Sequence, residues 1–141
     1  VFHSREAGEE TLRVLREERA YEVAGVMHYF QADGDTARHA IDLGFYISLA
    51  RPLLRLTELQ EVAARLPLDY LVLETDAAPQ PFKAKRENWT EPRHLATVAQ
   101  KLADLHGVPL ERVETAVTRN IKKVLGAGWE AVERHLRLPP V

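Results

Sequence analysis

The sequence contains no cysteine, whereas histidine occurs six times in its 141 residues. Without thiols the chain can form no disulfide, no cysteine nucleophile and no thiolate metal site. Any metal ion would therefore have to be bound by nitrogen and oxygen ligands. Histidine and the carboxylates are the residues to follow along the chain.

The chain also has no apolar run long enough to cross a membrane and no signal-peptide pattern, so we expect a cytoplasmic protein without a membrane partner. A net charge of -2 and an isoelectric point near 6.3 argue against a dedicated nucleic-acid coat. A local basic patch could still hold a phosphate. With 45% hydrophobic and 28% charged residues, the composition is that of one globular domain covering residues 1–141.

One apolar run ends in acids and organises the rest of the sequence. Leu71–Leu73 can be buried on both faces of a sheet and leads into Glu74-Thr75-Asp76. This is how a central parallel strand delivers an acid to the carboxyl end of an α/β sheet. Two earlier runs have the same construction with histidine in place of the acid, ending at His3 and His28. A further strand-like run, residues 44–49, ends in no ligand.

The ends of these four runs recur about every 25 residues, which is the period of consecutive βα units. Between and after them the apolar spacing predicts amphipathic helices. The expected helices cover residues 6–19, 36–42, 57–65, 90–106, 110–125 and 129–136, with Thr90 as the cap of the fourth. The fold class is therefore α/β with parallel strands, and all the strand ends should share one edge of the sheet. Because Val1 already lies inside the first strand pattern, we expect the chain to be a fragment.

A histidine at a strand end is more often structural than a metal ligand. His3, His28 and Asp76 together, at one edge of a parallel sheet, favour a metal site. The long loop from Ala77 to Trp89 follows Asp76 directly and contains three basic residues, Lys83, Lys85 and Arg86. Such charges usually form a solvated loop, but this position beside the acid favours a functional role.

Several segments together resemble the C-terminal half of the TatD-like DNase family, and the resemblance covers nearly the whole chain. The matching segments, in order, are His3-Ser4-Arg5-Glu6-Ala7, Gly25-Val26-Met27-His28-Tyr29-Phe30, Gly44-Phe45-Tyr46-Ile47-Ser48, residues 66–76, Arg86-Glu87-Asn88 with Glu91-Pro92, and residues 118–125. The Glu-Thr-Asp strand and the His-x-Arg-x-Ala strand end are the most specific of them.

The resemblance implies the second half of a (β/α)8 TIM barrel of the amidohydrolase superfamily, strands five to eight with their helices. His3, His28 and Asp76 would then bind one or two divalent metal ions, and mixed nitrogen and oxygen ligation leaves Mg, Mn or Zn open. The family's first-strand His-x-His pair and fourth-strand glutamate have no counterpart here, which implies a missing N-terminal half of the same protein.

The implied activity is a metal-dependent hydrolase that cleaves phosphodiester bonds in DNA, with single strands or ends as substrate. Asp76 would be the catalytic acid-base group that takes a proton from the activated water. The cationic side chains of Arg5, Lys83, Lys85 and Arg86 would bind phosphate oxygens, and Trp89 could stack a base.

Two departures from the family pattern keep other functions open. Tyr29-Phe30-Gln31-Ala32 stands where the family usually has Cys-Phe-Ser-Gly, and Glu74–Asp76 is followed by Ala77-Ala78-Pro79 in place of x-Pro. Both altered loops are expected to lie beside the substrate. The alternatives are a related barrel that hydrolyses an amide, ester or lactone, and a half-barrel without activity. In either case the fragment alone should be inactive.

Overall fold

The computed structural model describes residues 1–4, 6–23, 25–80, 85 and 89–136. Four strands form one parallel sheet in the order β1-β2-β3-β4. The strands are β1 (Phe2–His3), β2 (Gly25–His28), β3 (Phe45–Leu49) and β4 (Leu71–Leu73). Their order in the sheet equals their order in the chain, so the predicted run of four consecutive parallel strands is confirmed.

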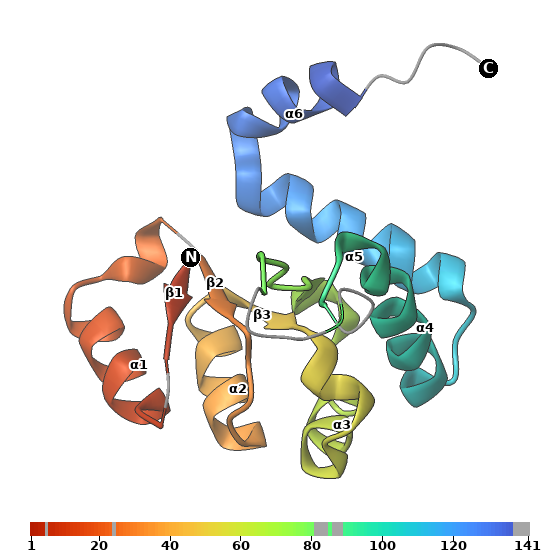
Figure 1. Ribbon diagram of the computed structural model, residues 1–141. Helices are drawn as coiled ribbons and strands as arrows, with labels where there is room; N and C mark the ends of the chain where they lie inside the picture. The colour runs from red at the N-terminus through yellow and green to blue at the C-terminus, as the bar shows by residue number, and fades with distance from the viewer. Residues whose placement is uncertain (5, 24, 81–84, 86–88, 137–141) are drawn as a thin grey trace.

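Within the described residues, six α-helices accompany the sheet (Figure 1). They are α1 (Gly8–Glu17), α2 (Gly34–Asp42), α3 (Thr57–Ala63), α4 (Leu95–His106), α5 (Leu110–Leu125) and α6 (Trp129–Leu136). Short 3-10 turns cover Ala20–Glu22, Arg51–Leu54, Leu68–Tyr70, Pro92–His94 and Gly126–Gly128. The bounds of α5 and α6 are those predicted from the sequence, whereas α1 and α4 begin later than predicted.

The two late helix starts have local causes. Glu6 has a left-handed backbone with φ 54°, which cannot continue into a helix, so α1 begins at Gly8. Before α4, the predicted cap Thr90 is wrong. The carboxylate of Glu91 and the ring of His94 form a reciprocal capping box around the Pro92–His94 turn. Thr90 instead accepts a hydrogen bond from Arg51, at 3.1 Å.

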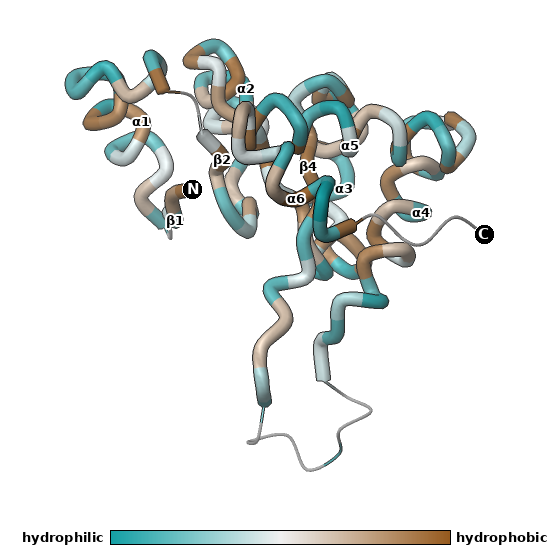
Figure 2. The backbone as a smooth tube through the Cα atoms, turned by 90° about the horizontal axis from the view of Figure 1, so that it is seen from above, coloured by the Kyte–Doolittle hydropathy of each residue, from teal (hydrophilic) through white to brown (hydrophobic). Residues whose placement is uncertain are grey.

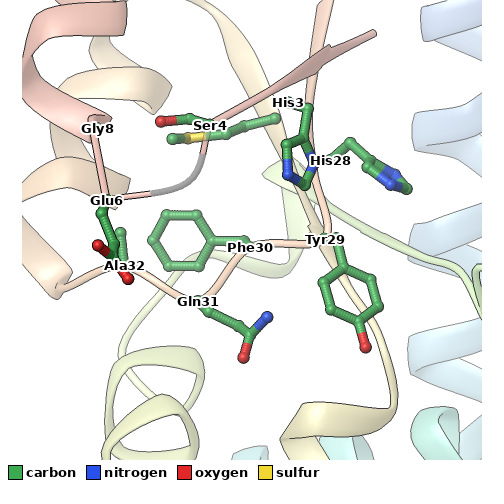
Figure 3. A pocket seen from close by; sticks show the side chains of 10 residues that line it. His3, Ser4, Glu6, Gly8, His28, Tyr29, Phe30, Gln31 and Ala32 are labelled. Atoms are coloured by element: carbon green, nitrogen blue, oxygen red, sulfur yellow. The ribbon is translucent and has the colours of Figure 1, made fainter.

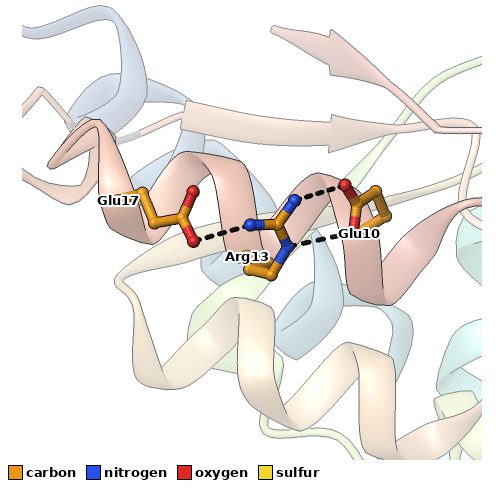
Figure 4. A network of polar contacts seen from close by, with 3 residues as sticks. All are labelled: Glu10, Arg13 and Glu17. Atoms are coloured by element: carbon orange, nitrogen blue, oxygen red, sulfur yellow. Dashed lines mark hydrogen bonds and ion pairs between the residues drawn. The ribbon is translucent and has the colours of Figure 1, made fainter.

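The exposed side of α1 shows how a solvated helix face is held. Arg13 donates from Nη1 to Glu17 Oε1 at 2.7 Å and from Nε to Glu10 Oε2 at 3.0 Å (Figure 4). The hydrogen bond and the charge of Arg13 lower the pKa of the Glu10 carboxyl. The side chains of these pairs are exposed, and pairs spaced by three and four residues favour helix formation.

Alternate residues of the strands separate two apolar clusters. Phe45, Ile47 and Leu49 of β3 face the main core with α1 to α5, and all three are buried. Tyr46 points to the other face, where it packs with Val26 and Val72. Ile121 and Val124 of α5 cover this smaller cluster. We call this second face, opposite the main core, the inner face of the sheet. Helix α5 covers its apolar cluster, and the residues at the carboxyl ends of the strands lie beyond that cluster.

After β4 the chain leaves the body of the molecule. Figure 2 shows the two described stems of this loop side by side, one following β4 and the other leading to α4. The backbone N–H of Thr90 donates to Gln80 Oε1 at 3.3 Å across them. This hydrogen bond therefore joins the two described stems at Gln80 and Thr90. No helix among the described residues is long and apolar enough to span a membrane.

Candidate functional site

His3 and His28 lie next to each other at the carboxyl ends of adjacent strands. They are register partners in the β1–β2 pair, and the centroids of their rings are 5.6 Å apart. Both follow a core-facing residue, Phe2 and Met27, so both side chains project from the inner face. The alternation of the strands therefore accounts for their shared position.

The carboxylate of Glu74 holds the ring of His28 through its Nδ1 atom. Its Oε2 lies 2.7 Å from His28 Nδ1, and its Oε1 accepts the backbone N–H of Tyr29 at 2.7 Å. Two oxygens of one carboxylate thus hold both the ring and the backbone that follows it. A carboxylate accepts hydrogen bonds, so this contact assigns a proton to His28 Nδ1 and leaves Nε2 as the acceptor nitrogen of that tautomer.

That free nitrogen faces Asp76. His28 Nε2 and Asp76 Oδ1 are 3.8 Å apart, and the Asp76 side chain is 59% exposed. Asp76 has a left-handed backbone with φ 50°, a conformation that aspartate adopts more readily than most residues. Because the regular strand has ended at Leu73, this turn brings the carboxylate back towards His28.

The donor set fits a divalent cation in type. It offers two imidazoles and a carboxylate, and His28 has the carboxylate partner on its second nitrogen that metal-bound histidines commonly have. His28 lies beside His3 and 3.8 Å from Asp76, so it neighbours both of the other predicted ligands. Among the described residues, however, no group of three or more His, Asp or Glu side chains could hold a metal ion. The predicted ligand role of these three residues stays a prediction.

A pocket of about 380 Å³ opens beside the two histidines. In Figure 3, His3, His28 and Tyr29 gather on one side of it and Glu6 lies on the opposite side. Residues 29–32, where the sequence departs from the family pattern, cross from the Tyr29 side to the Glu6 side, with the ring of Phe30 between the two sides. A substrate in this pocket would contact the altered loop directly.

The basic loop is only partly described. Lys85 is exposed, and Trp89 is half-buried in the wall of a separate pocket of about 480 Å³ with Ala77–Pro79 and Thr90–Arg93. Three of the predicted substrate-binding residues, Arg5, Lys83 and Arg86, lie outside the described residues. Their predicted roles stay predictions, and so do those of Lys85 and Trp89.

The sequence did not single out Glu74 as a partner of His28. A signal was present, because Glu74 and Asp76 are two positions apart and alternate residues of a strand share a face. Glu74 appeared only as part of a motif, and nothing local in the sequence links it to His28, 46 residues earlier.

Comparisons with known proteins identify the family of this chain. A model of the family described as TatD related DNase matches residues 1–126. The Escherichia coli (strain K12) protein YcfH is 37% identical over 129 residues, which cover 88% of this chain and 48% of YcfH. Bacillus subtilis YabD is 33% identical over 129 residues, covering 88% of this chain and 49% of YabD. Both are named as uncharacterised metal-dependent hydrolases.

Solved structures of TatD proteins have a fold similar to that of this chain. The crystal structure of YjjV, a TatD homologue from Escherichia coli K12, superposes with a TM-score of 0.76 and 27% sequence identity, covering 86% of this chain and 48% of that chain. A TatD family hydrolase from Entamoeba histolytica shares the fold with a TM-score of 0.75 at 19% identity, covering 87% of this chain and 49% of that chain. The chain spans about half the length of each of these relatives. Sequence and fold together show that the chain belongs to the TatD-related DNase family.

Proposed function

We propose that this chain is the C-terminal half of a TatD-type (β/α)8 barrel, residues 1–141 forming strands five to eight, and that the complete barrel hydrolyses phosphodiester bonds in DNA. The family, the half-length coverage and the four consecutive parallel strands support this proposal. The observation that carries it is the arrangement of His28 between Glu74 and Asp76.

Each residue has a distinct role in the proposed reaction. His3, His28 and Asp76 would hold one or two divalent ions, completed by ligands from the missing half. When bound, such an ion supplies a water of lowered pKa and neutralises charge on the phosphodiester. Asp76, whose exposed carboxylate lies 3.8 Å from His28 Nε2, would be the group that accepts a proton in this reaction. Glu74 keeps His28 Nε2 directed at Asp76 by holding Nδ1.

Single-stranded DNA is the proposed substrate. Arg5, Lys83, Lys85 and Arg86 would bind nonbridging oxygens, and Trp89 would stack a base. A duplex holds its bases inside, whereas a single strand can present phosphate and base to the same rim.

Asp76→Asn in the full-length protein tests the proposal. The amide has nearly the same shape but cannot take up a proton at neutral pH, so cleavage of a single-stranded oligonucleotide should fall about 100- to 10,000-fold. Bound metal should fall much less. Asp42→Asn, an exposed residue at the end of α2, is the matched control and should cleave like the wild type.

Two outcomes would contradict the proposal in different ways. Wild-type cleavage by a folded Asp76→Asn protein removes Asp76 from the mechanism. Hydrolysis of a small ester or lactone by the wild type, without cleavage of single-stranded DNA, assigns the site to a related amide or ester hydrolase.

A further inference from the structure

A second pocket lies beside the site, and it is lined by arginine. Its volume is about 460 Å³, and the lining residues are Tyr29, Arg51, Pro52, Leu54, Arg55 and Thr90. The two arginines follow β3, the strand that ends in no metal ligand. They therefore stand at the same edge of the sheet as the carboxyl ends of β1, β2 and β4.

Tyr29 joins this pocket to the histidine pocket, because it lines both. Its ring centroid is 5.9 Å from that of His28. Its backbone is left-handed, with φ 51°, and its N–H is held by Glu74. A tyrosine in this conformation is uncommon and needs such support. Tyr29, whose N–H is held by the same carboxylate that contacts His28, therefore forms the wall shared by the two pockets.

The local backbone holds both arginines in place. Pro52 and Leu53 are buried in the 3-10 turn Arg51–Leu54, and the N–H of Arg55 donates to Pro52 O at 3.1 Å. Arg51 is half-buried, and its Nη1 donates to Thr90 Oγ1 at 3.1 Å. The anchored turn between them leaves both guanidinium groups beside one pocket.

The charge of this pocket is not cancelled by the groups around it. Within the part of the chain that the structure describes, no ion pair involves Arg51 or Arg55. The nearest carboxylate along the chain from Thr90 is Glu91, which pairs with Arg93 Nε at 2.6 Å and caps the following turn. Two guanidinium groups therefore face a pocket without a carboxylate in its lining.

We propose that the Arg51–Arg55 pocket binds a backbone phosphate of the nucleic acid next to the phosphodiester that is cleaved. Guanidinium forks match phosphate oxygens in geometry as well as charge, which a lone lysine does not. Because Tyr29 lines both pockets, this second phosphate would lie next to the histidine pocket at the same edge of the sheet. The inference deepens the proposed function and rests on it for the identity of the ligand.

The test is binding of a fluorescent single-stranded oligothymidylate to the full-length protein in excess EDTA, so that no cleavage takes place. Arg51→Ala/Arg55→Ala should weaken binding at least about tenfold, because two charged donors to phosphate are lost. The slope of log K against log salt should become shallower by about 0.7, since each neutralised phosphate of a single strand contributes roughly 0.7. Arg51→Lys/Arg55→Lys should keep the slope but recover only part of the affinity.

The matched control is Arg65→Ala, which removes the same charge after α3, at the opposite edge of the sheet, from an exposed position. It should change neither affinity nor slope. If the double variant does not fold, Arg55→Ala alone takes its place, because the Arg55 side chain is exposed.

The inference and the proposed function fail differently. If the protein cleaves DNA and the arginine variants bind with wild-type affinity and slope, the pocket is not a phosphate site although the activity stands. If the variants lose affinity while the wild type cleaves no DNA, the phosphate site stands and the assigned reaction is wrong.

Discussion

The two faces of the sheet carry different residues: one carries the large apolar core, and the other carries a small apolar cluster and polar side chains. The face towards the helices buries Phe45, Ile47 and Leu49 in one continuous core. The inner face has only a small apolar cluster around Tyr46, closed by α5, and then the polar groups of His28 and Glu74. Both sets come from the same strands at alternate positions. A shift of one residue in register would exchange the residues of the two faces, so the large core also fixes which face carries His28 and Glu74.

Leu49→Ala tests this division with the largest expected effect. Leu49 is fully buried in the main core, so its truncation should lower the free energy of unfolding by about 2–5 kcal/mol. Val72→Ala on the inner face removes fewer methyl groups from a smaller cluster and should cost clearly less. Denaturant unfolding of both variants measures the difference. Equal losses would show that the two faces stabilise the fold alike.

Asn120→Ala tests how α5 is attached to the inner face. Asn120 is fully buried, and its Nδ2 donates to Leu68 O at 2.8 Å and to Leu71 O at 2.7 Å. The substitution leaves two carbonyls at the start of β4 without this donor, which should cost about 1–3 kcal/mol of stability. Hydrogen exchange should become faster in β4 and α5. Thr118→Ala, on the same helix, is the control and should stay within about 0.5 kcal/mol.

The sequence predicted the strand order and the strand-end residues better than the contacts between distant segments. Strand order and the positions of His3, His28 and Asp76 follow from the apolar runs and from the βα period, which are local signals. The cover of Tyr46 by Ile121 and Val124 joins residues about 75 positions apart, and no local pattern encodes it. The pairing of Glu74 with His28 and the Arg51–Thr90 contact are long-range in the same way.

Glu74→Gln tests the chemical side of the comparison. The amide can still bond one partner but loses the charge that favours a proton on His28 Nδ1. We expect metal affinity or DNA cleavage by the full-length protein to fall about 10- to 100-fold, with little change in the unfolding temperature. Glu58→Gln on the exposed start of α3 is the control. Unchanged affinity and cleavage would show that Glu74 does not position His28 for function.

Asp33→Ala has the smallest expected effect and concerns the loop from β2 to α2, where the two faces meet. Asp33 Oδ1 accepts the N–H of Thr36 at 2.8 Å as the cap of α2. Removing such a cap costs about 1 kcal/mol. Asp33→Asn keeps the acceptor and should lose only a few tenths of that, since asparagine caps helices about as well.

The same residue makes a prediction about pH. The hydrogen bonds from Thr36 lower the pKa of the Asp33 carboxyl below its ordinary value of 3.8. Because the folded pKa is the lower one, the stabilisation is complete above the unfolded pKa and is lost as the pH falls through the folded pKa. The gap in unfolding free energy between wild type and Asp33→Ala should therefore narrow below about pH 4, while the gap between Asp33→Asn and Asp33→Ala stays constant. A wild-type gap that is the same at pH 7 and pH 2.5 would show that the carboxylate charge contributes nothing to the cap.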